Sequence, residues 1–301
     1  MLAGMCLLVV AGCELQEVTV VDIEDVLVAE VFANIAPDPG DNEIVALVHR
    51  TLQPGVTYDD LATTSITVTR SDGFSVELSL QAYDRCVSAA VGDPGLCFAA
   101  EGAAVGDIGP GDLLEVEVAF EDGRLLVGAT RIPGAFDLEG VPPFCRLGPD
   151  ELMTIRWSAA DGAWAYLNET SMRNLPDALA REGIEFNTHP LYLLGLSISD
   201  DDTSIVFPSE FGVFNRFDLD QDVAVRLQRG MPIFSDAEVA ITAVDRNFVN
   251  WARGGNFNPS GQVRVPSLRG DGTGVFGSTV GRSFDLVVTS PTPSLEDCPL
   301  G

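Results

Sequence analysis

Residues 114–124 read LEVEVAFEDGR, and this stretch decides the class of fold. Apolar and acidic residues alternate at every second position, which is the spacing of a β-strand with one buried and one solvent-facing side. Asp122 and Gly123 then supply a turn, and a second apolar stretch returns from Leu126 to Ile132. The pattern predicts a β-hairpin whose glutamates lie on the solvent face.

The first half of the chain repeats this strand pattern. Residues 27–35 alternate in the same way, residues 43–52 are almost continuously apolar, and a second hairpin turns at Ser71 to Gly73. Six or seven such strands fit between residues 25 and 134. This arrangement is typical of a β-sandwich of immunoglobulin-like size. We therefore expect residues 25–134 to form an N-terminal immunoglobulin-like β-sandwich.

A stretch rich in proline and glycine, residues 135–150, shows no periodicity and predicts a linker. Residues 151–288 then predict a second β-rich, sandwich-like domain with one or two short helices, and residues 289–301 a C-terminal tail. The fold class expected for the whole chain is all-β, in the sense of mainly β.

Two segments of the second half carry helix signals, and the others read as strands. The expected helices are residues 175–182, with Pro176 in the first turn, and residues 245–253, with Asp245 as N-cap. The expected strands lie near residues 153–157, 192–198, 205–207, 223–227, 239–244 and 284–288.

The charge balance excludes one class of partner. The 301-residue chain has 45 Asp and Glu against 17 basic residues, all of them arginine, for a formal net charge of -28. Nucleic acids are bound by basic patches, and an acidic surface repels their phosphates. No apolar run reaches the roughly 20 residues of a membrane-spanning helix. We expect a globular chain that binds no nucleic acid.

The first thirteen residues predict the compartment. An apolar run from Leu2 to Val10 leads into small residues that end at Cys13, although no basic residue precedes the run. The segment resembles the lipobox of bacterial lipoproteins, which implies a signal peptide over residues 1–12 and a lipid on Cys13. Residues 13–24 then form a tether to the membrane. Glu14 favours the outer membrane, on its periplasmic or cell-surface face.

The other cysteines agree with export. Cys86, Cys97, Cys145 and Cys298 remain after the signal peptide and the lipidated residue are set aside, and an even number suits an oxidising compartment. Turn residues between Cys86 and Cys97 favour a bridge between these two, which leaves Cys145 to pair with Cys298. A zinc site is the rival interpretation, but no Cys-x-x-Cys motif is present.

The glycine-rich stretch Gly270 to Gly277 matches the spacing G-x-G-x-x-G of dinucleotide-binding loops. Such a loop requires a helix after it, whereas a strand is expected from Phe284. We interpret the glycines as a turn or bulge where two backbones approach closely, and we expect no cofactor.

Two acidic clusters are candidates for a calcium site. Asp218, Asp220 and Asp222 have the alternating spacing of a calcium loop, but the sixth position is Val223 and the twelfth is Arg229. The EF-hand interpretation therefore fails. A different calcium site, here or at residues 200–202, keeps a calcium-dependent adhesion module as an alternative.

Catalytic candidates are few. His49 and His189 are the only imidazoles, and no G-x-S-x-G or H-E-x-x-H motif occurs. We expect no enzyme, with a secreted-type hydrolase as the alternative. Trp157 is typical of a sandwich core. The candidates for a ligand surface are Trp164, Tyr166 and Trp251, although aromatic residues in β-proteins are more often core.

Two segments resemble a family of bacterial outer-membrane lipoproteins catalogued as a domain of unknown function. The first segment is the hairpin with Gly109-Pro-Gly111, Val116, Val118, Asp122-Gly-Arg124, Gly128, Thr130 and Pro133, and Leu114 stands where the family usually has Tyr. The second is the stretch Gly270 to Gly277, with Val275 and Phe276. The resemblance implies an accessory protein of TonB-dependent outer-membrane transporters that binds or docks a partner. It carries over only the lipidated Cys13.

Overall fold

The computed structural model describes residues 26–51, 58–86, 95–188, 190–197, 199–211, 220–255, 265–291 and 294–300. Within these ranges it has fifteen strands and three α-helices, which confirms the prediction of a mainly β chain. The strands are β1 (Leu27–Ile35), β2 (Glu43–Arg50), β3 (Ser65–Arg70), β4 (Ser75–Gln81), β5 (Leu96–Glu101), β6 (Leu113–Ala119), β7 (Leu125–Arg131), β8 (Phe144–Leu147), β9 (Met153–Arg156), β10 (Ala165–Met172), β11 (Leu191–Leu196), β12 (Ser204–Phe207), β13 (Asp236–Val244), β14 (Leu268–Gly270) and β15 (Gly272–Val288). The helices are α1 (Leu175–Ala180), α2 (Gln221–Leu227) and α3 (Arg246–Gly255), and the short 3-10 turns are η1 (Pro39–Asp41), η2 (Asp59–Leu61), η3 (Tyr83–Arg85) and η4 (Gly102–Ala104).

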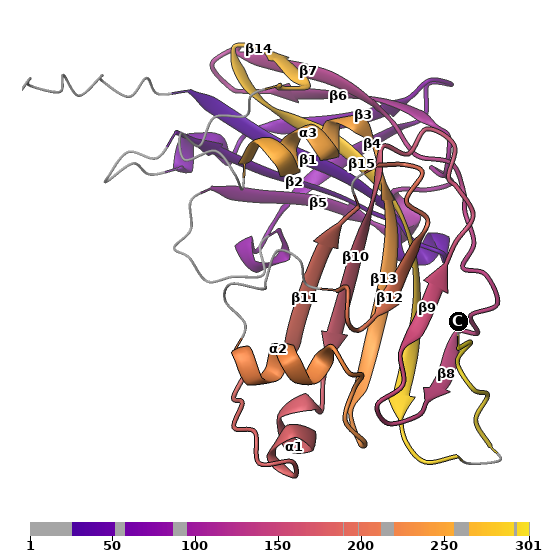
Figure 1. The fold of residues 1–301 in the computed structure, drawn as a ribbon. Coiled ribbons are helices and arrows are strands. Elements are labelled where there is room, and N and C mark those ends of the chain that lie inside the picture. The colour runs from indigo at the N-terminus through magenta and orange to yellow at the C-terminus, as the bar shows by residue number, and fades with distance from the viewer. Residues whose placement is uncertain are drawn as a thin grey trace, which may run out of the picture.

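The first lobe is a closed ring of strands (Figure 1). The hydrogen-bonded order is β1-β2-β5-β4-β3-β6-β7-β14-β15, and β15 pairs back to β1, so that nine strands enclose one core. The alternation seen in the sequence determines which side chains face the core. Leu114, Val116 and Val118 are buried, whereas Glu115 and Glu117 face solvent. We call this part, β1 to β7 with β14 and the first half of β15, the ring lobe.

The glycine-rich stretch closes the ring. β15 runs parallel to β1, with Leu27 opposite Gly272 and Ala29 opposite Gly274. A Cβ atom on Gly274 would lie 1.9 Å from the carbonyl oxygen of Ala29, and the φ of Gly274 is +153°. Only glycine therefore fits this contact. The interpretation of residues 270–277 as a close approach of two backbones is confirmed.

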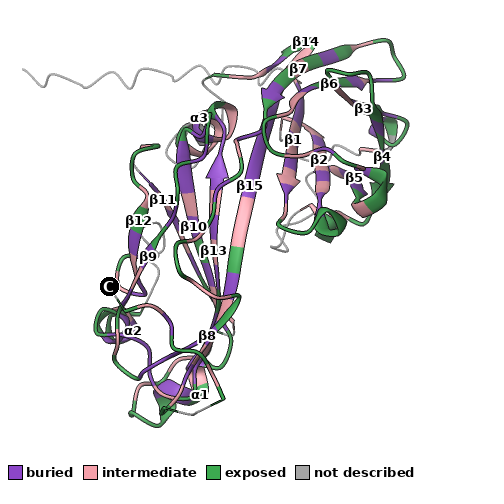
Figure 2. Ribbon diagram, turned by 90° about the vertical axis from the view of Figure 1, so that its right-hand side faces the viewer, coloured by how far each residue is buried: buried purple, intermediate pink, exposed green. Residues whose placement is uncertain are grey.

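The second lobe continues from the same long strand (Figure 2). The lower half of β15 pairs with β13, β13 with β10 and β10 with β11, while β8 adds in parallel to the end of β15. The two-stranded sheet of β9 and β12 lies in a second layer, with α1 and α2 at the lower end. Tyr166, Trp157 and Phe136 pack edge to face in the buried core between the layers. We call this part the second lobe.

Two expectations about the organisation of the chain need correction. The strands of residues 25–134 do not close on themselves, because β14 and β15 from the end of the chain complete their ring. Residues 135–150, expected as an aperiodic linker, include β8, which pairs with residues 285–288. Proline and glycine hide this strand from a periodicity argument, since it is only four residues long.

One expected strand is a helix. Residues 223–227 belong to α2, where Val223, Arg226 and Leu227 are buried at helical spacing. The side chain of Asp220 accepts a hydrogen bond from the backbone N–H of Asp222, which caps the helix. The two other helices, α1 and α3, form within one or two residues of their expected bounds. No helix in the described ranges is long and apolar enough to cross a bilayer.

Candidate functional site: a hollow at the junction of the lobes

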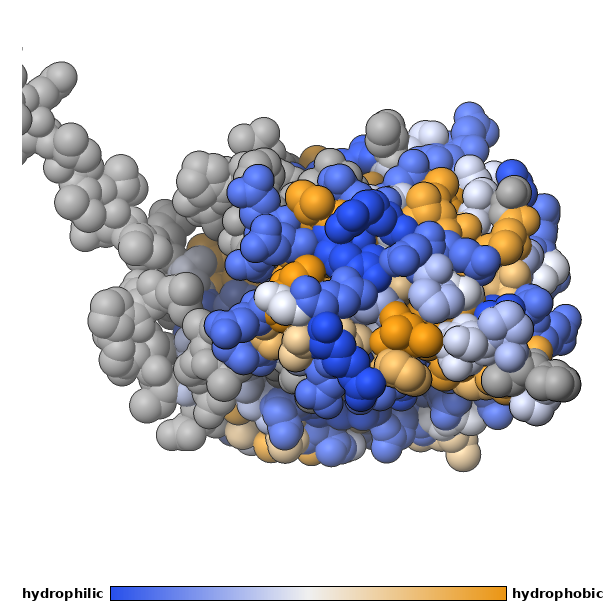
Figure 3. All heavy atoms as spheres, turned by 60° about the horizontal axis from the view of Figure 1, so that its bottom comes forward, coloured by the Kyte–Doolittle hydropathy of each residue, from blue (hydrophilic) through white to orange (hydrophobic). Residues whose placement is uncertain are grey.

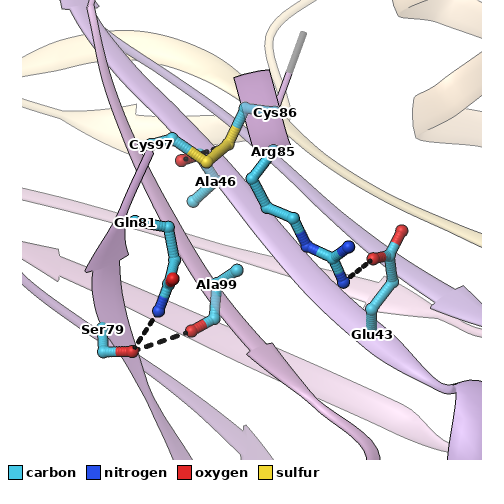
Figure 4. The surroundings of a disulfide bond; sticks show 8 residues. All are labelled: Glu43, Ala46, Ser79, Gln81, Arg85, Cys86, Cys97 and Ala99. Carbon is cyan, nitrogen blue, oxygen red and sulfur yellow. Dashed lines mark hydrogen bonds and ion pairs between the residues drawn. A yellow bond between two sulfur atoms is a disulfide. The ribbon is translucent and has the colours of Figure 1, made fainter. Parts of the chain in front are cut away.

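Both expected disulfides are present. Cys86 bonds to Cys97 and ties η3 to β5, next to an ion pair between Arg85 and Glu43 (Figure 4). Cys145 on β8 bonds to Cys298 near the end of the chain. Bonds of this kind persist in oxidising compartments.

Several of the other residues singled out in the sequence lie outside the described part of the chain. Residues 1–24, with Cys13, and also His189 and Asp218 fall outside the described residues. His49 is half-buried on β2, where its Nδ1 lies 3.0 Å from the carbonyl oxygen of Arg50. Within the described ranges, no three His, Cys, Asp or Glu side chains are grouped to hold a metal ion.

A buried carboxylate joins the two lobes. Asp245 follows β13 and is 4% exposed. Its Oδ2 accepts a hydrogen bond of 2.6 Å from the Thr130 hydroxyl on β7, and its Oδ1 accepts from the backbone N–H groups of Phe248 (2.8 Å) and Ser278 (3.2 Å). Burial raises the pKa of Asp245, and these hydrogen bonds partly offset the rise. Asp245 therefore links β7, β13, β15 and the first turn of α3.

A hollow of about 360 Å³ opens directly outside this joint. We call it the junction hollow. Its lining combines backbone-tethered polar groups with one large aromatic ring, and the residues used below are Thr130, Arg131, Trp164, Asp245, Arg246 and Asn247. Asn247 is fixed there, because its side-chain amide donates to the carbonyl oxygens of Ala129 (3.0 Å) and Phe276 (2.8 Å).

Trp164 and Arg246 form one wall of the junction hollow. The Trp164 side chain is 50% exposed, although its backbone N–H is fixed by the carbonyl of Val244 at 2.9 Å. The Arg246 guanidinium lies over the indole, 5.0 Å from the ring centroid. This cation–π contact holds the flat face of the guanidinium and leaves its N–H edge for other acceptors.

The arginines of this hollow differ from those of two other surface hollows. Among the described residues, neither Arg131 nor Arg246 forms an ion pair. The lower hollow, beside Phe144 at the end of the second lobe, holds Arg173 between Asp236 (3.2 Å) and Asp285 (2.7 Å). A third hollow on the ring lobe, the ring hollow, pairs Arg124 with Asp122 at 2.7 Å. Arginine is thus already neutralised in both of the other hollows.

The surface around the lower hollow gives no broad apolar area. In Figure 3, where the lower end of the molecule comes forward, apolar side chains appear as separate patches between polar ones. Phe144 and Phe234 are exposed at this end, and the guanidinium of Arg181 covers the Phe234 ring at 4.7 Å. Single exposed apolar residues of this kind are ordinary on a protein surface.

Of the three aromatic residues proposed to line a ligand surface, the structure places one at a hollow. Trp164 is there, Tyr166 is fully buried, and Trp251 donates its indole N–H to Glu30 at 2.9 Å. The sequence did not single out Arg131 and Arg246. An arginine in a chain with 45 acids looks like a surface counter-charge, and no local pattern shows that two of them line one hollow.

Comparisons with known proteins give no family. No protein-family model and no curated protein matches the chain. Among solved structures, a DUF4785 family protein from Legionella pneumophila is similar at 14% identity and a TM-score of 0.24 over 71% of this chain, which spans 51% of that protein. Fibronectin(III)-like modules of Clostridium thermocellum CbhA are similar at 10% identity and a TM-score of 0.21, covering 87% of this chain and 94% of theirs.

Proposed function

We propose that this chain is a lipid-anchored protein of the bacterial outer membrane that binds a ligand or partner at the junction hollow. The observation that carries this proposal is the half-exposed Trp164, stacked with Arg246 over a hollow whose other walls are held by hydrogen bonds. A pre-formed concave site with a few fixed polar groups and an aromatic ring is typical of binding sites. We propose no catalytic role.

Two features support the compartment. The disulfides Cys86–Cys97 and Cys145–Cys298 agree with export. The lipobox ends at Cys13, and β1 begins at Leu27. A fully extended chain between them reaches about 50 Å at most. The tether would therefore keep the ring lobe close to the membrane surface, where a TonB-dependent transporter is the partner implied by the family resemblance.

We describe the ring lobe as immunoglobulin-like only as part of this proposal. In its favour, the strands expose one face and bury the other around a single core, with Ile44, Ile66 and Leu114 among the fully buried residues. The pairing of β1 with β15 adds a closure that a two-sheet sandwich does not need.

Membrane fractionation tests the anchor. Cys13→Ser should move the full chain from the membrane to the soluble fraction, because the lipid-carrying thiol is lost. Cys6→Ser is the matched control, since it changes a cysteine of the segment that is removed. Membrane association that survives Cys13→Ser would contradict the anchor.

Affinity capture from solubilised outer membranes tests the binding site. Trp164→Ala should reduce the amount of bound partner or ligand by at least about tenfold, as expected for a central aromatic contact. Tyr192→Ala, at another exposed aromatic residue on β11, should leave it unchanged. Equal capture by both variants would remove the junction hollow from the proposal.

A further inference from the structure

The charge of the junction hollow is opposite to that of the molecule as a whole. Its lining has two arginines, Arg131 and Arg246, against one aspartate, Asp245. The lower hollow has one arginine against two aspartates, and the ring hollow one arginine against three acids. In a chain of net charge -28, the junction hollow is therefore the one of these three that has a positive lining.

The acid in the junction hollow is already satisfied. The carboxylate of Asp245 accepts hydrogen bonds from Thr130, Phe248 and Ser278, and in the described part of the chain neither arginine is its partner. Arg131 uses one N–H for the carbonyl oxygen of Gly111 at 3.1 Å. Arg246 has no hydrogen bond to any acceptor in the described part of the chain, and its position over Trp164 orients it. The donor edge of Arg246 is thus held ready for an acceptor from outside.

We propose that the junction hollow binds a small ligand with a carboxylate on a six-membered ring, a deepening that rests on the function proposed above. The planar guanidinium edge of Arg246 fits both oxygens of a carboxylate, and Arg131 adds a second positive charge. Trp164 supplies an apolar surface beside that edge for the ring of the ligand. A volume of about 360 Å³ has room for one ring of this size.

Two matched pairs of probes test the proposal by calorimetric titration of the full chain. D-galacturonate is compared with D-galactose, and benzoate with benzyl alcohol, because each pair differs in the carboxylate and shares the ring. We expect at least one carboxylate to bind about tenfold more tightly than its neutral counterpart. The pair that binds shows whether the ring is a sugar or an aromatic ring. Equal binding within both pairs, or no carboxylate binding at millimolar concentrations, would overturn the proposal.

Variants assign the effect to the guanidinium. Arg246→Gln should weaken carboxylate binding about tenfold, and Arg246→Lys nearly as much, because lysine keeps the charge but loses the planar fork. Arg269→Gln removes an exposed arginine on β14, outside the lining of the junction hollow, and should have no effect. Full carboxylate binding by Arg246→Lys would contradict the claim that the planar guanidinium edge holds both carboxylate oxygens. Capture that still depends on Trp164 while the probes show no preference for a carboxylate would refute this inference alone and leave the binding function standing.

Discussion

The two lobes hold their strands in place by different means. In the ring lobe the sheet closes on itself through the backbone pairing of β1 with β15, and its disulfide, Cys86–Cys97, spans only 11 residues. In the second lobe the sheet ends openly at β11, and Cys145–Cys298 spans 153 residues. A closed sheet has little need of distant cross-links, whereas an open, layered one depends on them.

Side chains show the same difference. In the second lobe, the buried guanidinium of Arg226 on α2 pairs with Glu182 (2.5 Å) after α1 and with Asp150 (2.7 Å) after β8. Arg146 on β8 pairs with Asp297 and donates to the carbonyl oxygen of Thr289 at 3.0 Å. These links join segments far apart in the sequence, and they add to the strand pairing of the second lobe.

The largest effect should come from removing the long disulfide. Replacing Cys145 and Cys298 by serine should lower the free energy of unfolding by about 5 kcal/mol, because the unfolded chain loses its longest constraint. The same change at Cys86 and Cys97 should cost about 3 kcal/mol, since a shorter loop is released. Urea denaturation of the two double variants measures both. A larger loss at the short disulfide would contradict the contrast between the lobes.

The ring lobe should instead be most sensitive to a substitution at the glycine contact between β1 and β15. Gly274→Ala should cost at least about 3 kcal/mol, because a Cβ there meets the backbone of Ala29 and the φ of +153° is strained for alanine. Gly183→Ala, in the second lobe, is the matched control: its φ is +82°, but no atom lies within 4 Å of the added Cβ, so it should cost about 1 kcal/mol. Equal losses in thermal unfolding would show that β1 and β15 separate easily.

The sequence predicts what each strand does alone, and not which strands meet. Residues 114–124 correctly predict a hairpin with its glutamates outside, because burial of one face leaves a local signature. The partner of β1 leaves no such signature, since β15 comes from the opposite end of the chain. Gly270 to Gly277 indicates a close approach of two backbones without naming the second one.

The sequence likewise indicates only some of the residues of the candidate site. Trp164 is one of the three aromatic residues that the sequence offers for a ligand surface, and the structure places it at the hollow. Arg131 and Arg246 meet at the junction hollow only because ring closure brings the end of β7 beside the start of α3. The α2 helix was expected as a strand for a related reason. Four apolar residues within residues 223–227 suit a strand as well as a helix, and Asp220 was considered only as a possible calcium ligand and not as a cap.

The joint between the lobes and a side-chain link within the second lobe should respond to pH in opposite directions. Burial raises the pKa of Asp245 above its ordinary 3.8, so the folded joint gains stability as the pH falls from neutral through that pKa. The hydrogen bond from Arg226 lowers the pKa of Glu182 below its ordinary 4.5, so this link loses stability as the pH falls below 4.5.

Asp245→Asn and Glu182→Gln separate these two contributions. Relative to the native chain, Asp245→Asn should lose its rise in stability toward acidic pH, because the amide keeps the acceptor oxygen and cannot titrate. Glu182→Gln should lose the decrease in stability that the native chain shows below pH 4.5. Denaturation midpoints measured across the acidic range give each difference curve. Curves with the same sign for both variants would contradict the assignment of the Asp245 shift to burial and of the Glu182 shift to the hydrogen bond from Arg226.

The smallest effect should come from an arginine that is paired only at the surface. Arg173 and its partner Asp285 in the lower hollow are each about half exposed, so water already solvates both charges. Arg173→Gln should therefore change the free energy of unfolding by less than about 1 kcal/mol. It should also leave carboxylate binding at the junction hollow unchanged, as measured by the same calorimetric titration. A large loss of stability would mean that the second lobe relies on exposed pairs as well as on buried cross-links, and the contrast with the ring lobe would then rest on charge rather than on closure.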